Sequence, residues 1–329
     1  MTLTRRELLR NAVCYASAMV LPAPLLGCSG GAGDDPPAPA TEGTSGGTAT
    51  ASPAHTPPTP EDEARLLRWV RVLREEGLVE ASDSVGLAAV RVGELAAGTP
   101  YEAYTLEQYL KAGGSPSRTE PLTLHLDRFD CVSLVESCLA IARVAHADGD
   151  PTWDAFAREM ERMRYRGAER GGYTSRLHYF SEWIDDNERR GLVRVLGREL
   201  GGEADTRPLR FMSTHPDSYP ALSVPGVLTE IEAMERSLDE KPRWVIPTAR
   251  IGEIAGRIES GDVLAFATSI EGLDVTHSAF AYRGADGVLR VLHAPLSGGV
   301  VEVTESTLPQ YVAAIRRATG ILVARPLWG

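Results

Sequence analysis

The sequence is poor in cysteine, with four in 329 residues, at positions 14, 28, 131 and 138. It has no His-Glu-x-x-His motif and no closely spaced group of cysteines, which are the patterns that most often bind zinc. We therefore expect neither a metal nor another cofactor. The scarcity also makes each cysteine informative, because a thiol without a disulfide partner is either core filler or a reactive group.

Positive charge is also scarce. Asp and Glu number 45 against 34 Lys and Arg, which gives a net charge of −11, so we expect no nucleic-acid partner. No internal repeat is visible, and the apolar run at residues 11–26 is too short for a comfortable transmembrane helix. With 43% hydrophobic and 24% charged residues, the rest of the chain has the composition of a globular protein.

Residues 1–28 have the features of an export signal. Arg5-Arg6 forms a twin-arginine pattern ahead of the apolar run. The run ends at Leu25-Leu26-Gly27-Cys28-Ser29, which resembles a lipoprotein processing box in which Cys28 becomes the lipidated N-terminus. Leu26 is bulkier than this box usually allows, so cleavage nearby and an uncleaved anchor helix stay open as alternatives. We expect export by the twin-arginine route and a periplasmic or cell-surface lipoprotein, held at the membrane by its lipid.

Residues 29–58 consist mainly of Gly, Pro, Ala, Thr and Ser. A segment of this composition buries too little apolar surface to offset the entropy of ordering it, so we predict a disordered tether. A single domain should follow at residues 59–329, and we expect it to be a monomer.

Within this domain, helices precede a series of strands, which predicts an α+β fold. Thr59-Pro60-Glu61-Asp62 is typical of a helix start, and Gly77 ends that helix. Residues 150–240 form a polar, mainly helical insertion. Strands are predicted at 193–196, 209–212, 244–246, 262–266, 276–282, 288–293, 300–303 and 321–325, and further helices at 84–97, 152–165, 175–184, 226–238 and 308–318.

Cys131 lies where a helix is expected to begin. Asp130 is a good N-cap, and apolar residues then recur at helical spacing to form one buried face, on which Cys131 also lies. The partial positive charge at a helix N-terminus favours a thiolate, so Cys131 is a candidate nucleophile. The alternative is a small, buried and unreactive cysteine under a capped helix. Cys138 is about 10 Å away by helical rise, beyond disulfide reach, and fits core filler.

A cysteine nucleophile needs a base and a group that orients the base. His277 and His293 lie on predicted neighbouring strands on either side of a hairpin turn at 284–287, so pairing would bring them together. They are the candidate base and orienter, and His178 is the strongest alternative. The remaining histidines fit the tether, the surface or a structural position: His55, His125, His146 and His215.

Several short motifs in a fixed order carry a resemblance to a known family. Gly98-x-Pro100-Tyr101, Asp130-Cys131-x-Ser133-Leu134, the run 261–266, His277 and His293-Ala294 resemble the NlpC-type papain-like cell-wall hydrolases. Phe129-Asp130-Cys131, the run 176–183 and Leu273-Asp274-Val275-Thr276-His277 look more closely like the N-acetylmuramoyl-L-alanine amidase-like family. The resemblance covers about residues 80–329. Ser133 and Leu134 replace that family's commoner threonine and phenylalanine, away from the proposed chemistry.

The resemblance implies a papain-like core in which the nucleophile helix packs on an antiparallel sheet, with the insertion between nucleophile and base. Cys131 would be the nucleophile, His277 the base and His293 the orienter. Tyr101 would line the site near the cysteine. The substrate cleft would take its other residues from the insertion and the strand entry, namely Arg176, His178, Tyr179, Trp183 and Asp274.

The function implied is a cysteine amidohydrolase acting on peptidoglycan or muropeptides, at the bond between N-acetylmuramic acid and L-alanine. Three alternatives stay open: a stem-peptide endopeptidase of the same fold, a non-catalytic wall-binding lipoprotein, and an acyltransferase that uses the same cysteine and histidine. A metalloenzyme is the weakest reading, because the zinc motifs named above are missing.

Overall fold

The computed structural model describes residues 55–80, 84–296 and 299–329. The predicted signal, Cys28 and most of the predicted tether lie outside these residues. Residues 55–58, which the sequence assigned to the tether, belong to the folded part: His55 forms a parallel bridge with Leu122, and the Thr56 amide donates to the Leu122 carbonyl at 2.9 Å. In the described part of the chain, no helix is long and apolar enough to cross a membrane.

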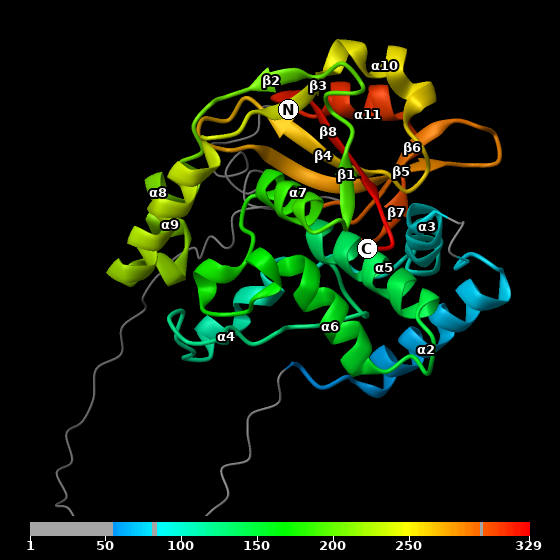
Figure 1. Ribbon diagram of the computed structural model, residues 1–329, viewed down its shortest axis with the longest axis horizontal. Coiled ribbons are helices and arrows are strands. Elements are labelled where there is room, and N and C mark those ends of the chain that lie inside the picture. Colours follow the sequence, from blue (N-terminus) through cyan, green and yellow to red (C-terminus); the bar gives the residue numbers. More distant parts are fainter. Residues whose placement is uncertain (1–54, 81–83, 297–298) are drawn as a thin grey trace, which may run out of the picture.

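One antiparallel sheet is the centre of the fold (Figure 1). Its order is β2-β3-β8-β4-β5-β6-β7, with β1 also paired to β8. The strands are β1 (Val193–Val195), β2 (Glu203–Asp205), β3 (Arg243–Pro247), β4 (Val263–Thr268), β5 (Val275–Arg283), β6 (Leu289–His293), β7 (Glu302–Val303) and β8 (Ala318–Pro326). The predicted α+β class, with helices on an antiparallel sheet, is confirmed.

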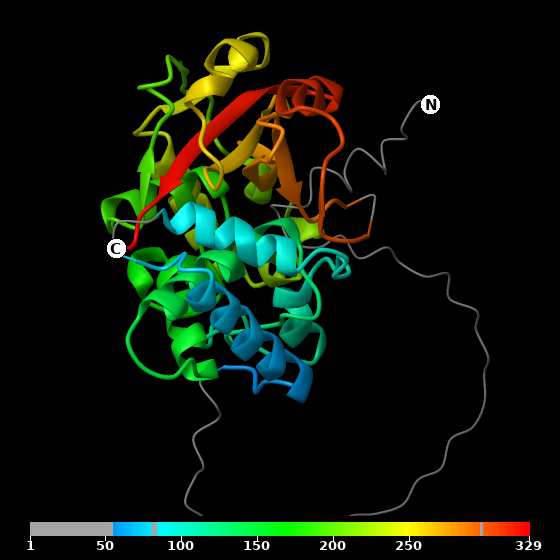
Figure 2. The same cartoon turned by 90° about the vertical axis from the view of Figure 1, so that its right-hand side faces the viewer.

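Two layers of helices cover the two faces of the sheet (Figures 1 and 2). Side chains alternate along β4, so Val263 and Ala265 face one layer while Leu264 and Phe266 face the other. The first layer contains α2 (Pro60–Glu75), α3 (Val85–Leu95), α5 (Cys131–His146) and α6 (Trp153–Arg164). The second contains α10 (Ile251–Ile254) and α11 (Leu308–Ala314).

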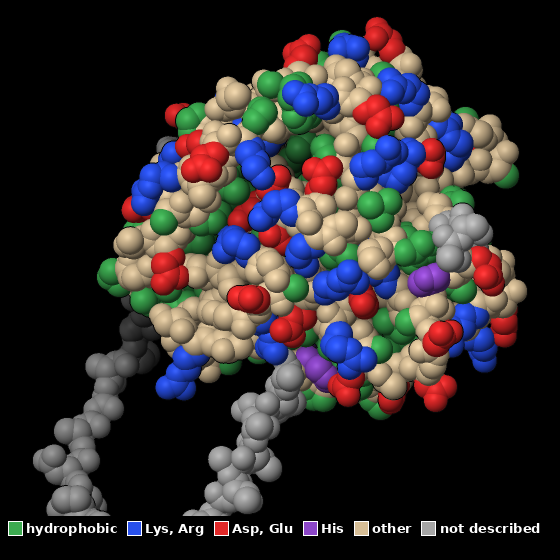
Figure 3. Space-filling model, in the orientation of Figure 1, with side chains coloured by type: hydrophobic (Ala, Val, Ile, Leu, Met, Phe, Trp, Pro, Cys, Tyr) green, Lys and Arg blue, Asp and Glu red, His purple; other side chains and the backbone are tan. Residues whose placement is uncertain are grey.

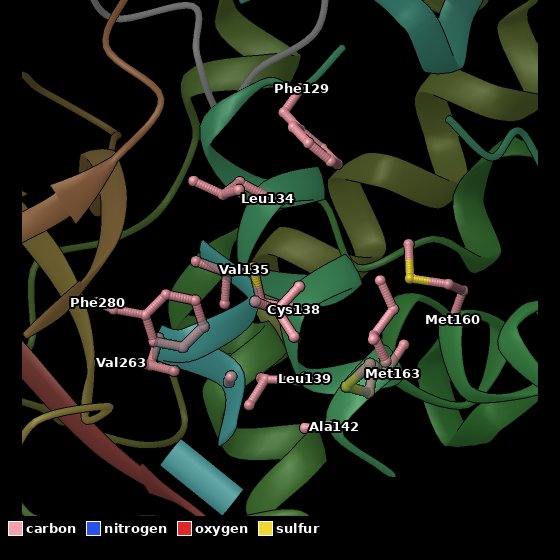
Figure 4. Packing of buried hydrophobic residues seen from close by; sticks show 14 of the residues in the cluster. Phe129, Leu134, Val135, Cys138, Leu139, Ala142, Met160, Met163, Val263 and Phe280 are labelled. Atoms are coloured by element: carbon pink, nitrogen blue, oxygen red, sulfur yellow. The ribbon is translucent and has the colours of Figure 1, made fainter. Parts of the chain in front are cut away.

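Helix α5 is the most deeply buried helix of the first layer, because its apolar stripe meets the sheet while its flanks meet α3 and α6. Figure 4 shows Cys138 among Val135, Leu139 and Phe280, and its side chain is fully buried. Burial raises the pKa of the Cys138 thiol, so this cysteine stays protonated. Its predicted place in the core is therefore confirmed.

The insertion forms a third apolar cluster and also extends the sheet. The insertion contains α7 (Phe180–Arg189), α8 (Phe211–Thr214) and α9 (Pro225–Leu238), and the third cluster lies around α8 and α9. Strands β1 and β2 of the insertion pair with β8 and β3. The strand predicted at 209–212 is wrong, because α8 begins at Phe211. The helix predicted at 175–184 begins only at Phe180. A short helix, α4 (Gln108–Lys111), lies before α5.

The surface carries both signs of charge. Figure 3 shows acidic and basic side chains interspersed over the visible face rather than gathered by sign. Local ion pairs form on the described surface, such as Arg91 with Glu76 and Arg290 with Asp286, each at 2.7 Å. Solvent screens such exposed pairs, so they contribute little to the free energy of unfolding.

Candidate active site

Cys131 is the first residue of α5, and the polar groups around it fix that helix start. The Asp130 carboxylate accepts hydrogen bonds from the amides of Val132 and Ser133, at 3.0 and 2.7 Å. The Ser133 hydroxyl accepts one from the Asp130 amide at 2.9 Å, which completes a capping box. Cys131 is fully buried, at the end of the helix where the backbone carries partial positive charge. The predicted cap is confirmed.

Strand β5 is bound directly to this helix start. The Ser278 hydroxyl donates to the Cys131 carbonyl at 3.0 Å, and Ser278 directly follows His277 in β5. Consecutive Cα atoms are only about 3.8 Å apart, so this bond fixes the backbone of His277 beside the first turn of α5. The structure thus brings together two segments that are separated by 147 positions in sequence.

A β-bulge lies at His277. Ala265 pairs with Ser278 and Ala267 pairs with Val275, so residues 276 and 277 together oppose Phe266 alone. A bulge of this kind redirects side chains locally and interrupts the alternation of faces. The His277 ring stacks on Phe266, with 5.6 Å between ring centroids.

His277 and His293 form a hydrogen-bonded pair. The Nε2 atom of His277 lies 2.8 Å from Nδ1 of His293, and strands β5 and β6 are paired as predicted across the turn at 284–287. Both rings are buried, with 9% and 2% of their surface exposed. Burial lowers the pKa of His293 to about 4, so this ring is neutral near neutral pH.

Tyr101 lies beside the segment that leads into Cys131. It forms a parallel bridge with Phe129, and the neighbouring amides of Glu102 and Phe129 bond to the carbonyls of Phe129 and Pro100, each at 3.0 Å. Residues 100–102 therefore run along the entrance to α5. That the Tyr101 side chain lines the site stays a prediction.

The four residues predicted from the run 176–183 are buried and have partners inside the protein. Arg176 donates to Glu107 at 2.5 Å, and the His178 ring bonds to the Tyr173 carbonyl at 2.8 Å. The remaining two bond to acids: Tyr179 to Glu235 at 2.6 Å and Trp183 to Glu136 at 3.2 Å. The Arg176 and Trp183 contacts hold the insertion against Glu107 and α5, whereas the His178 and Tyr179 contacts lie within the insertion. A role of these residues in binding substrate stays a prediction.

Asp274 has a structural task that the sequence did not reveal. Its carboxylate accepts from the Ser181 amide at 2.8 Å and from the Val275 amide at 2.7 Å. Tyr179, the N-cap residue of α7, supplies no side-chain cap, so Asp274 caps that helix from the loop before β5. Asp274 thereby ties the insertion to the strand that carries His277.

Three further residues at the site were missed by sequence reasoning: Ser278, Glu302 and Tyr311. The Tyr311 hydroxyl lies 3.2 Å from Nδ1 of His293, and a Glu302 carboxylate oxygen lies 3.8 Å from its Nε2. Nothing in the sequence singles them out, because each depends on a contact between separate elements. In the described ranges, no group of three or more His, Cys, Asp or Glu could hold a metal ion.

The other histidines lie in different surroundings. His55 pairs with Asp154 at 2.7 Å, His146 stacks on Trp328, and His215 stacks on Phe211. His125 is partly buried, and its desolvation lowers the pKa of its ring. The structure therefore joins only His277 and His293 into a hydrogen-bonded pair among the histidines it describes.

Comparison with known proteins connects this geometry to a family. A family model described as AmiA-like, N-acetylmuramoyl-L-alanine amidase-like, matches residues 91–321. Among solved structures, an N-acetylmuramoyl-L-alanine amidase from Bacteroides uniformis ATCC 8492 has 31% identity and a TM-score of 0.67, over 74% of this chain and 99% of that one.

Two further structures widen the comparison. A Bacteroides fragilis protein described as a proposed xylanase has 34% identity and a TM-score of 0.64, over 71% of this chain and 98% of that one. A Legionella pneumophila protein has 18% identity and a TM-score of 0.58, over 81% and 95% of the two chains, which is a likeness of fold alone. No curated protein matches the chain.

Proposed function

Because the chain belongs to the N-acetylmuramoyl-L-alanine amidase-like family, we propose that it hydrolyses an amide bond of peptidoglycan with Cys131 as nucleophile. The proposed bond joins N-acetylmuramic acid to L-alanine. The observation that carries the proposal is the bond between Ser278 and the Cys131 carbonyl, next to the paired rings of His277 and His293.

In the proposed mechanism, Cys131 gives its thiol proton to His277 and the sulfur attacks the amide carbonyl carbon. The electron pair moves to the carbonyl oxygen, which the Cys131 amide and the N-terminal end of α5 stabilise. The C–N bond then breaks and His277 protonates the leaving nitrogen. A water molecule, deprotonated by His277, attacks the thioester, releases the carboxylate product and restores the thiol.

His293 acts as the orienter in this scheme. Its Nδ1 lies 2.8 Å from the Nε2 of His277, so the other nitrogen of His277, Nδ1, is left to exchange the proton with the thiol. Because the His293 pKa is about 4, its neutral ring can accept a hydrogen bond from His277 without repelling the imidazolium that forms there.

Two broader proposals accompany the mechanism. The capped nucleophile helix on an antiparallel sheet fits an NlpC-type papain-like core, and the first 28 residues fit an exported lipoprotein attached through Cys28. A peptidoglycan substrate is consistent with a location at the cell surface or in the periplasm. Labelling cells with a radioactive fatty acid tests the anchor: a Cys28→Ala protein should carry no label.

Digestion of purified peptidoglycan tests the proposed reaction, with the new termini identified by mass spectrometry. An amidase exposes the amino group of L-alanine and leaves the lactyl carboxylate on the sugar, whereas an endopeptidase produces new termini within the stem peptide. Xylan incubated in parallel tests the activity suggested for the Bacteroides fragilis relative. Release of reducing sugar from xylan, with intact peptidoglycan, would overturn the proposal.

Cys131→Ala should abolish cleavage, because it removes the nucleophile while the capping box stays in place. Cys138→Ala is the matched control, since it removes a buried thiol from the same helix. This variant should be less stable than the wild type but should still cleave peptidoglycan. Equal cleavage by wild type and Cys131→Ala would show that another group carries the reaction. Binding without cleavage by both would favour the non-catalytic wall-binding alternative.

A further inference from the structure

The two nitrogens of His293 have different surroundings. Nδ1 lies between His277 Nε2 at 2.8 Å and the Tyr311 hydroxyl at 3.2 Å. Nε2 is buried and has no hydrogen-bond partner within the described structure, and the carboxylate of Glu302 lies 3.8 Å away. Glu302 is directly opposite His293 in the pairing of β6 with β7, and about half of its side chain is exposed.

A neutral histidine carries one ring proton, so His293 has two possible tautomers. With the proton on Nε2, Nδ1 accepts a bond from His277 Nε2–H, and His277 keeps Nδ1 as an unprotonated base. With the proton on Nδ1, His293 donates to His277 Nε2, and the neutral His277 must carry its own proton on Nδ1. In that state His277 has no lone pair for the Cys131 thiol.

The contacts at Nδ1 do not select between these tautomers. A histidine nitrogen can donate or accept, and the Tyr311 hydroxyl can do the same. An ionised carboxylate only accepts, so Glu302 favours a proton on the Nε2 that faces it. At 3.8 Å this action is electrostatic or passes through a bridging water rather than through a direct hydrogen bond.

We propose that Glu302 is a positioning residue that holds the proton of His293 on Nε2, and thereby leaves Nδ1 of His277 free to act as the base. The inference rests on the proposed cysteine mechanism for its consequence in catalysis. Its structural part, the tautomer of two histidines in the resting protein, holds independently of any substrate. Glu302 itself touches neither the thiol nor the substrate in this scheme.

Nitrogen-15 NMR of histidine-labelled protein at neutral pH tests the structural part, with the two rings assigned from His277→Gln and His293→Gln variants. In the wild type, both His293 and His277 should be protonated on Nε2. Glu302→Gln keeps the shape of the side chain, but its amide end can present either an oxygen or an NH2 group. A second tautomer of both rings should therefore become visible in that variant.

Kinetics test the consequence. Glu302→Gln should lower kcat by about three- to tenfold with KM unchanged, well short of the roughly 10⁴-fold loss that a fully wrong tautomer causes in a serine protease triad. Glu305→Gln is the matched control, because Glu305 is exposed three residues further on and should match the wild type in spectrum and kcat.

A wild-type His293 protonated on Nδ1 would overturn the inference, and so would a Glu302→Gln spectrum identical to that of the wild type. If the spectra follow the expectation but the wild type cleaves no peptidoglycan, the proposed function fails while the role of Glu302 in the tautomer stands.

Discussion

At the scale of single residues, His293 combines a polar ring with deep burial. Only 2% of its surface is exposed, and burial lowers its pKa to about 4, against about 6.5 for an unperturbed histidine. A folded chain that binds this proton more weakly than the unfolded chain becomes less stable as the pH falls between these two values. The same burial that makes His293 a neutral acceptor thus makes it sensitive to acid.

This sensitivity predicts a difference between the wild type and His293→Asn. The contribution of His293 to the free energy of unfolding is complete above pH 6.5 and is lost as the pH falls toward 4. Between pH 7 and pH 5 this loss amounts to about 2 kcal/mol. Urea unfolding at pH 7 and pH 5 should show that the free energy of unfolding drops more in the wild type than in His293→Asn, by about 2 kcal/mol. Parallel pH dependences in the two proteins would contradict the prediction.

Cys138→Ala is the control for this comparison. The buried Cys138 thiol has a raised pKa and does not titrate in the acid range, so this destabilised variant should keep the pH dependence of the wild type. His178 is also buried with a lowered pKa, and it contributes in the same window to all three proteins. Its contribution therefore cancels in the comparison.

At the scale of elements, the insertion is joined at the N-terminus of α7 to β5, the strand that carries His277. The Asp274 carboxylate accepts from the Ser181 amide of α7 and from the Val275 amide of β5, so one side chain serves both elements. A cap supplied from another segment makes the start of α7 dependent on the loop before β5. Gly272 in that loop also accepts from the amides of Arg210 and Phe211, each at 3.0 Å, where α8 begins.

Asp274→Ala should lower the free energy of unfolding by about 1–2 kcal/mol, because the first turn of α7 loses its cap and a buried amide loses its partner. Asp274→Asn, which keeps one acceptor oxygen, should recover part of the lost free energy of unfolding. Hydrogen exchange should locate the effect, with faster exchange at the α7 N-terminus and little change in α2. Uniformly faster exchange in both helices would argue against a local cap.

At the scale of the whole molecule, the parts predicted well are those that neighbouring residues determine. The cap at Asp130 and the turn at 284–287 are local signals, and they placed Cys131 and the His277–His293 pair correctly on their elements. Local signals failed at 209–212, where apolar spacing suggested a strand but contacts with Gly272 support a helix. Ser278, Asp274 and Glu302 act across elements, so no local pattern could reveal them.

A buried ion pair and an indole hydrogen bond join the three helices α5, α6 and α7. Glu136 of α5 accepts from Arg164 of α6 at 2.8 Å and from the Trp183 indole of α7 at 3.2 Å, and both members of the pair are about 2–3% exposed. Removing one member leaves a buried charge without its partner, so Glu136→Leu alone should cost about 3–5 kcal/mol. Arg164→Met alone should cost a similar amount.

The double variant should lose much less than the sum of the two single losses, because an apolar pair of similar volume leaves no buried charge. A cycle of the four proteins, measured by urea unfolding, gives the coupling directly. Additive losses would mean that each side chain acts through other contacts, such as the bond from Arg164 to the Thr123 carbonyl at 2.7 Å. The hydrogen bonds of the capping box at Cys131 involve neither Glu136 nor Arg164, so any double variant that remains folded should keep a measurable part of its proposed activity.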